Sequence, residues 1–202
     1  FLMNLAACFI VIIINQGLKK YGGDLAIGAF GIVNRLVFIV VMIVMGLNQG
    51  MQPIAGYNFG AKLYGRVNKV LKLTIIYATA VTTFGFLVGM LVPDLVVGIF
   101  TSDAELTELS VTGLRITVMF FPIIGFQMVT SNFFQSIGMA GKAIFLSLTR
   151  QMLILLPCLL VLPQFFGVAG VWYSMPVSDL LASLIALVML VCQFRKFRTS
   201  PL

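Results

Sequence analysis

Residues 168–194 read VAGVWYSMPVSDLLASLIALVMLVCQF, and Asp179 is the one charged side chain among them. A helix of about 20 mainly apolar residues is long enough to cross a hydrocarbon core of roughly 30 Å. The run is also too long and too continuous for a barrel strand, which alternates polar and apolar residues over about ten positions. The stretch therefore predicts a helix that crosses a membrane.

Five further apolar runs resemble this one, at residues 1–18, 27–53, 70–92, 112–138 and 143–166. Over the whole chain 60% of residues are hydrophobic, 9% are charged and the mean hydropathy is +1.10. A soluble domain of this size has too little interior for so many apolar side chains. The sequence predicts an all-α, polytopic membrane protein in which residues 1–202 form a single bundle of six transmembrane helices.

The positive charges indicate how the bundle is oriented. If the first helix starts in the cytoplasm, the cytoplasmic segments hold eight basic residues: Lys62, Arg66, Lys69, Lys72, Lys142, Arg195, Lys196 and Arg198. The outer segments hold two, Lys19 and Lys20. This asymmetry predicts a multi-pass protein of the plasma (inner) membrane with both chain ends in the cytoplasm. The net charge of +7 is thereby explained by topology and lipid contact, and we expect no nucleic-acid partner.

The residues available for chemistry argue against an enzyme. There is no His, and the three cysteines stand alone within predicted helices. A nucleophile with a base, a pair of acids or a metal cluster would be needed, and none is visible. We expect no cofactor and no metal site. Because the first residue is Phe1 and the first apolar run is short, we also expect the chain to be a piece of a longer protein.

Asp179 is the first candidate site residue. An acid inside a membrane helix needs a partner, a cavity or a functional use. Pro176 precedes it and is expected to interrupt the helix and free a backbone carbonyl, while Ser183 follows one turn later. Asp179 could exchange a proton or a cation, or it could be a structural acid paired with an Arg or hydroxyl of a neighbouring helix.

A second candidate is a stripe of polar residues in the fourth run. Gln127, Ser131 and Gln135 are spaced i, i+4, i+8 and so share one helix face. The stripe could line a water-filled cleft. The alternative is a set of hydrogen bonds between helices, worth about 0.6–2 kcal/mol each.

Asn15 in the first run and Asn34 in the second are further polar candidates for substrate or ion binding. Arg35, Arg115 and Arg150 lie near the ends of runs, and we expect them to extend to the membrane interface. Two GxxxG patterns, Gly46/Gly50 and Gly85/Gly89, predict close approach of helices.

Residues 46–67, GLNQGMQPIAGYNFGAKLYGRV, are expected to leave the membrane and turn at Pro53. Lys62, Arg66 and Lys69 would then form one face of a short amphipathic helix against anionic headgroups. The stretch could be an ordinary connector or a hinge between moving helices. The residues that would form such a gate are Gln52, Pro53, Gly56, Asn58 and Gly60.

Three motifs in register resemble the multidrug and toxin extrusion (MATE) family. QGMQPIAGYNFGAKLYGRV resembles that family's loop after the second helix of each half, SNFFQSIGMAGKA (131–143) the end of its tenth helix, and GVWYSMPVSDLLA (170–182) the start of its twelfth. The resemblance covers the whole chain and aligns it with the C-terminal six helices of a twelve-helix transporter. It implies two lobes that rock about a substrate held between them.

The resemblance implies export of organic cations and drugs in exchange for protons or sodium ions. A lone buried carboxylate at Asp179, able to hold either a proton or a cation, would provide such an exchange. The implied partners are membrane lipids, a small organic cation and the missing N-terminal lobe. Acids that matter in the family's sodium-coupled branch are absent from the first and fourth helices here, which makes coupling through that pair doubtful. The alternatives are a related flippase of lipid-linked oligosaccharides, which should have a more cationic cleft, and a non-transporting scaffold.

Overall fold

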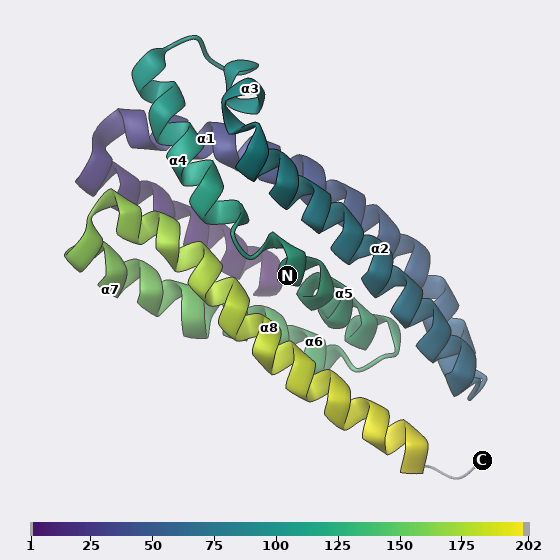
Figure 1. Ribbon diagram of the computed structural model, residues 1–202. Helices are drawn as coiled ribbons and strands as arrows, with labels where there is room; N and C mark the ends of the chain where they lie inside the picture. The colour runs from purple at the N-terminus through teal and green to yellow at the C-terminus, as the bar shows by residue number, and fades with distance from the viewer. Residues whose placement is uncertain (1, 200–202) are drawn as a thin grey trace.

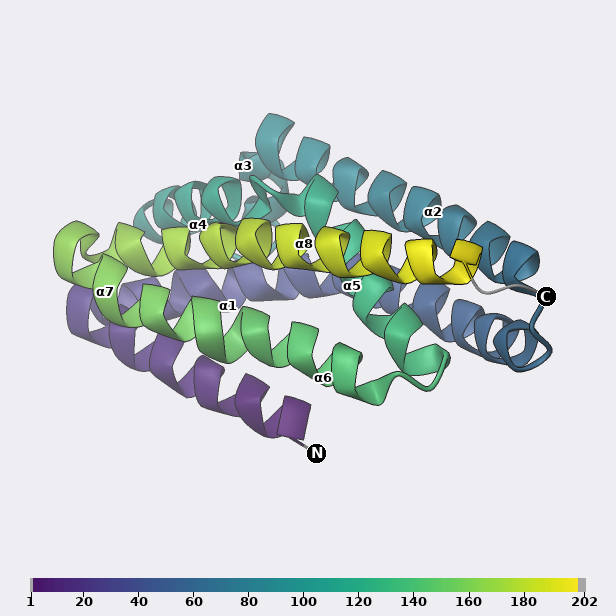
Figure 2. The same ribbon diagram turned by 90° about the horizontal axis from the view of Figure 1, so that it is seen from below.

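The computed structural model describes residues 2–199, with side chains from Leu5 to Arg195, and every regular element in this part is a helix. Phe1 and the side chains of Lys196 and Arg198 lie outside it. Figure 1 shows long rods running side by side in one bundle, and Figure 2 shows the same bundle from below. The elements are α1 (Leu2–Gly60), α2 (Tyr64–Leu91), α3 (Pro93–Gly98), α4 (Ala104–Val118), α5 (Phe121–Ser136), α6 (Ala140–Leu148), the π-helix η1 (Thr149–Leu155), α7 (Leu156–Phe166) and α8 (Val168–Thr199).

The long apolar helices agree with the predicted membrane spans. Among the described residues, four helices are long and apolar enough to cross a membrane, and α4 with α5 forms a fifth, bent by 55°. One of the four, α1, contains a break at Gly23 and is far longer than the roughly 20 residues that a crossing needs. If its two arms are counted separately, the total is six. The prediction of a helical membrane bundle is confirmed.

Gly23 turns the chain between the two arms of α1. Its φ of 66° and ψ of −160° lie in a region that essentially only glycine occupies. The first arm therefore folds back beside the second, as the purple segment in Figure 1 shows.

The turn predicted at Pro53 is wrong. α1 continues through Pro53 to Gly60, and α2 begins at Tyr64. A proline is tolerated inside a membrane helix where neighbouring helices satisfy the freed backbone groups. The separate amphipathic helix is also wrong, because Lys62 lies in the turn with a φ of 59° and Arg66 already belongs to α2.

The fourth and fifth predicted spans are interrupted helices. Met119 and Phe120 separate α4 from α5, and Pro122 occupies the first turn of α5. The fifth span contains seven π-helical residues, Thr149–Leu155. Pro157 is the second residue after this segment, and since it has no N–H to donate it cannot extend the π-helical hydrogen bonding. The sixth span, by contrast, is continuous: α8 passes through Pro176 without the interruption that we expected.

Two apolar clusters hold the bundle together. One surrounds Trp172 and Val33, and the other surrounds Phe133 and Leu71. Many large apolar side chains remain exposed, among them Phe84 and Leu91 on α2. In water this would be a severe cost, whereas in a bilayer these side chains meet lipid.

One of the two GxxxG patterns packs as predicted. A Cβ added at Gly85 would lie 2.9 Å from Val40 of α1, and one at Gly89 would lie 3.1 Å from Val118 of α4. These glycines let α2 approach both neighbours closely. Gly46 and Gly50 have no neighbouring atom within 4 Å of such a Cβ, so the prediction for that pair is wrong within the described chain.

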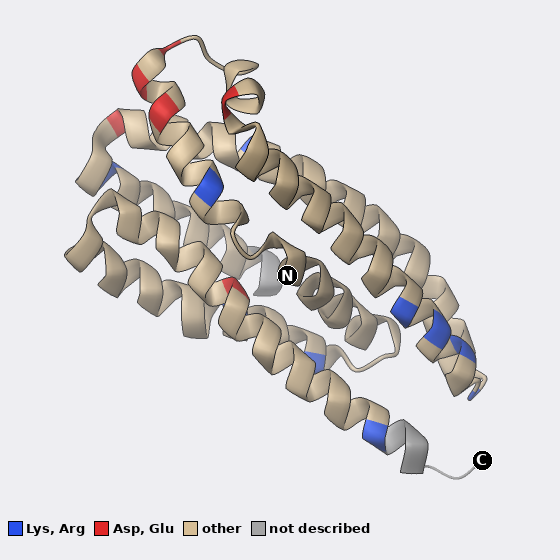
Figure 3. Ribbon diagram, viewed as in Figure 1, with Lys and Arg blue, Asp and Glu red and all other residues tan. Residues whose placement is uncertain are grey.

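Most acids lie toward one end of the bundle, where a few Lys and Arg lie as well (Figure 3). Acids gather where α3 and α4 begin, with Asp103 capping α4 by accepting a 2.8 Å hydrogen bond from the Leu106 backbone N–H. Lys and Arg gather at the opposite end, where α2 begins. The apolar middle of the bundle lies between these two ends.

Candidate functional site

Asp179 and Arg150 form an ion pair inside the bundle. Nε of Arg150 donates to Oδ1 of Asp179 at 2.7 Å. The Asp179 side chain is 6% exposed, whereas that of Arg150 is 34% exposed. The acid is therefore held in the interior, while the guanidinium reaches it from a partly open position. Asp179 thus has an Arg partner on a neighbouring helix, which was one of the two interpretations of this acid, and it is not a lone carboxylate. Arg150 does not simply extend to the interface, as we had expected.

The pair lies at the wall of a cavity of about 240 Å³. Most of the lining is apolar, with Phe30, Phe121, Met128 and Met175 among the larger side chains. The polar lining residues come from four elements: Asn34 from α1, Thr117 from α4, Arg150 from η1, and Ser178 and Asp179 from α8. An apolar pocket with a few converging polar groups is the usual form of a small-molecule site.

Local structure on η1 and on α8 positions the pair. Arg150 is the second residue of the π-helix, and such segments occur often at functional sites because they change where side chains point. On α8, the Ser183 hydroxyl donates to the backbone carbonyl of Asp179 at 2.6 Å. The Ser178 hydroxyl donates to the carbonyl of Met175 at 2.7 Å, close to the position of Pro176. Both hydroxyls thus satisfy the backbone and leave the carboxylate to Arg150.

Of the two predicted asparagines, one lines this cavity. Asn34 is exposed on α1 and belongs to the lining. Asn15 is half-buried on the first arm of α1 and lies outside the lining, although its neighbour Ile14 belongs to it.

The polar stripe on α5 does not line the cavity. Gln127 is buried, and its Oε1 has no hydrogen-bond partner within the described part of the chain. Ser131 meets Ser147 of α6, with 3.3 Å between the hydroxyl oxygens, and Gln135 is exposed near the end of α5. Ser131 thus makes the hydrogen bond between helices that was the alternative interpretation of the stripe.

The predicted gate residues lie on the last turns of α1, not in a loop. Gln52 donates from Nε2 to Oδ1 of Asn132 on α5 at 3.4 Å. A Cβ added at Gly56 would lie 2.9 Å from the carbonyl oxygen of Ser136, so α1 and α5 touch there. Asn58 donates to the carbonyl of Ile54 at 2.8 Å, while Pro53 is exposed and Gly60 ends α1. Of the five, Gln52 and Gly56 join α1 to the C-terminal half of α5.

Sequence reasoning missed Arg150, Thr117 and Ser178 as cavity residues. For Arg150 a signal was available: a charge inside an apolar run usually pairs with an opposite charge on a neighbouring helix. Thr117 and Ser178 gave no comparable signal, because hydroxyls in membrane helices commonly bond to their own backbone. Within residues 2–199, no three Cys, Asp or Glu side chains come together in a group that could hold a metal ion.

Comparison with known proteins identifies the family of the chain. The MatE family model matches residues 1–160. Multidrug export protein MepA of Staphylococcus aureus (strain MSSA476) is 29% identical over 187 residues, which cover 93% of this chain and 41% of MepA. The MepA protein of Staphylococcus saprophyticus is 25% identical over the same shares of the two chains. This chain thus spans less than half the length of the curated relatives that it matches.

Solved structures show the same arrangement of helices. The MATE multidrug transporter DinF-BH, in complex with rhodamine 6G, is 36% identical with a TM-score of 0.86 over 99% of this chain and 45% of that one. An outward-facing MATE family transporter of the MOP superfamily is 18% identical with a TM-score of 0.90 over 98% of this chain and 45% of that one. At 18% identity the second likeness supports the fold alone.

Proposed function

Because the chain belongs to the MATE family, whose members are transporters and not enzymes, we propose that it is one lobe of an exporter of lipophilic organic cations. The exporter would exchange these cations for protons or sodium ions. The observation that carries this proposal is the buried Arg150–Asp179 pair at the wall of a largely apolar cavity.

The pair supplies an exchange mechanism. Asp179 is buried, so it needs a positive partner or a proton at all times. Arg150 is that partner in this structure and is exposed enough to swing away. A cationic substrate, a sodium ion or a proton can then replace Arg150 at the carboxylate. One carboxylate cannot bind the substrate cation and the coupling ion tightly at the same time. Binding of one therefore favours release of the other.

The remaining lining fits a lipophilic cation. Phe30 and Phe121 offer aromatic rings that attract cations through their faces. Met128 and Met175 offer flexible, polarizable surface that adapts to ligands of different shape. This combination favours broad selectivity for flat or bulky cations over recognition of a single compound.

The charge of the cavity favours this exporter over the oligosaccharide flippase. A site for pyrophosphate needs excess positive charge. The one Arg in the cavity lining is neutralised by Asp179. The pair as it stands therefore offers no free cation to an anionic headgroup.

The rest of the transporter is part of the proposal. Residues 1–202 would be the C-terminal lobe, and an N-terminal lobe of the same protein would supply the other wall of the substrate path. Alternating access would come from one lobe rocking against the other in the plasma membrane. Neither lobe alone would transport. The basic end of the bundle would face the cytoplasm, as the positive-inside rule predicts.

The test is efflux by the full-length protein in proteoliposomes. Rhodamine 6G is a suitable first probe because the related DinF-BH structure is a complex with it. Efflux driven by a proton gradient and by a sodium gradient is compared for the unmodified protein, Asp179→Asn and Asp179→Glu. We expect Asp179→Asn to lose about tenfold in rate or more, since each 1.4 kcal/mol lost is a factor of ten, and Asp179→Glu to keep part of it.

Glu105→Gln is the matched control, since Glu105 is an exposed acid in the first turn of α4 and lies outside the cavity lining. It removes the same charge and should leave efflux unchanged. Full efflux by Asp179→Asn under both gradients would overturn the role of this pair. The gradient that drives the unmodified protein identifies the coupling ion.

A further inference from the structure

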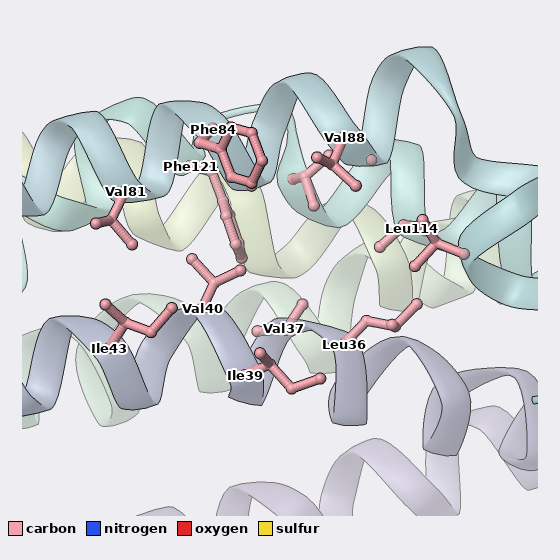
Figure 4. A pocket seen from close by; sticks show the side chains of 14 residues that line it. Leu36, Val37, Ile39, Val40, Ile43, Val81, Phe84, Val88, Leu114 and Phe121 are labelled. Carbon is pink, nitrogen blue, oxygen red and sulfur yellow. The ribbon is translucent and has the colours of Figure 1, made fainter. Parts of the chain in front are cut away.

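A second cavity opens on the outside of the bundle between α1 and α2. It measures about 230 Å³ and is lined only by apolar side chains and glycines. Figure 4 shows Leu36, Val37, Val40 and Ile43 of α1 facing Val81, Phe84 and Val88 of α2, with Phe121 and Leu114 lying deeper. Apolar cavities of roughly 150 Å³ already hold a benzene-sized molecule and stay free of water. This cavity has room for a longer apolar segment.

The shape of the cavity is that of a wedge open to the lipid. Its floor is buried, with Leu114, Val118 and Phe121 each at most 3% exposed. Its rim is exposed, with Ile39 at 56% and Phe84 at 69%. Gly85 and Gly89 line its α2 wall, where they allow close contact with Val40 and Val118. From Leu36 to Ile43 the wedge runs roughly 10 Å along α1, at ~1.5 Å per residue.

Positive charge lies at one end of the wedge. Arg35 precedes Leu36 and sits one turn from Ile39 on the exposed side of α1. Arg115 adjoins Leu114 on α4 and is also exposed. Arg35 lies about 18 Å along α1 from the bend at Gly23. Arg115 lies about 18 Å along α4 from the cap at Asp103. Neither guanidinium has an ion-pair or hydrogen-bond partner within the described chain.

We propose that this wedge is a binding site for a glycerophospholipid, with one acyl chain between α1 and α2 and the phosphate on Arg35. The wedge supplies the apolar slot, and the unpaired guanidinium supplies donors in the fork geometry that suits phosphate. The slot extends from Arg35 toward the middle of the membrane, the direction that an acyl chain takes below its headgroup. Val37 and Phe121 lie between this wedge and the Asp179 cavity and line both. The two sites differ in the ligand that each would take.

The experiment uses the full-length protein in nanodiscs with p-benzoylphenylalanine at Phe84, whose exposed ring lies at the mouth of the wedge. Discs of phosphatidylglycerol are compared with discs of a glycolipid that has the same acyl chains and no phosphate. After irradiation, the protein–lipid adduct is quantified by mass spectrometry. We expect a phosphatidylglycerol adduct that falls roughly tenfold with Arg35→Gln, since a charge-assisted bond is lost.

Val88→Phe tests the slot by filling it, and Leu87→Phe is its control because Leu87 is the neighbouring residue and lies outside the lining. Arg66→Gln is the charge control at the opposite end of the bundle. The proposal predicts a loss of adduct with Val88→Phe and none with either control. It is overturned by equal adducts in Arg35→Gln and the unmodified protein, by equal capture of the glycolipid, or by a cross-link to the other half of the transporter in place of lipid.

Discussion

Arg150 and Asp179 share a 2.7 Å hydrogen bond but differ in how much of each side chain is exposed. The carboxylate is held on the continuous helix α8 with its side chain 6% exposed, whereas the guanidinium sits on the π-helix with a third of its side chain exposed. The pair is therefore unequal. If Asp179 is removed, the Arg150 guanidinium can turn outward. If Arg150 is removed, the Asp179 carboxylate stays in the interior.

This inequality predicts different costs for the two single substitutions. Arg150→Gln should destabilise the full-length protein by about 3 kcal/mol, since it strands a buried charge. Asp179→Asn should cost about 1 kcal/mol or less, because the released Arg can extend toward headgroups. The double variant should recover much of the loss in Arg150→Gln. Thermal unfolding in detergent measures all three, and an equal loss in the two single variants would contradict the inequality.

Gly113 and Trp172 give a second prediction about stability. A Cβ added at Gly113 would lie 2.7 Å from the Trp172 ring, which is 2% exposed and packs against Phe30 with ring centroids 5.9 Å apart. Because the ring is rigid and buried, the added methyl group overpacks this contact, and Gly113→Ala should destabilise the protein by about 1–3 kcal/mol. Adding Trp172→Phe should relieve part of that clash, as thermal unfolding would show.

Gly46→Ala is the control for this substitution. Gly46 also lies within a helix, and nothing in the described chain lies within 4 Å of an added Cβ. Alanine there should be neutral or stabilising by about 0.5–1 kcal/mol, since it reduces the freedom of the unfolded chain. If both Gly→Ala variants lower the melting temperature equally, the contact with Trp172 does not limit the packing of α4.

The membrane spans could be predicted because each one is apolar along its whole length. A helix that faces lipid on one side and protein on the other has no position that favours a charge, so the pattern does not depend on the partner helices. The breaks predicted at Pro53 and Pro176 were wrong because they do depend on the partner helices. Whether a proline breaks a membrane helix depends on which neighbours satisfy its freed carbonyl, and that is a property of the packed bundle.

The candidate site was predicted only in part. Asp179 stood out because an acid in an apolar run is costly wherever it lies. Its pairing with Arg150 depends on the π-helical segment, which places Arg150 toward α8. No pattern of residue spacing in the sequence predicts that segment. Gln127 stood out equally and proved to lie outside the Asp179 cavity, since a polar residue can face any of several neighbouring helices.

Gly23 sets the angle between the two arms of α1, which predicts a large effect for a small substitution. At φ 66° and ψ −160° an alanine is strained even though no atom lies within 4 Å of its Cβ. Gly23→Ala should therefore cost about 1–3 kcal/mol through the backbone alone. Gly98→Ala, which also has open space around it and no positive φ, should cost less. Equal melting temperatures for these two variants would show that the bend tolerates a side chain.

The separation of charge along the bundle predicts which end can be reached from outside the cell. Ser102 is exposed in the turn before α4 at the acidic end, and Ala61 is exposed in the turn before α2 at the basic end. In a full-length protein whose native cysteines are replaced, Ser102→Cys should react with a membrane-impermeant maleimide in intact cells. Ala61→Cys should react only after permeabilisation, because the positive-inside rule predicts a cytoplasmic position for the end that carries Lys62, Arg66, Lys69 and Lys72. Labelling in the reverse order would show that the acidic end faces the cytoplasm, and the export direction proposed for the Asp179 cavity would have to be reversed with it.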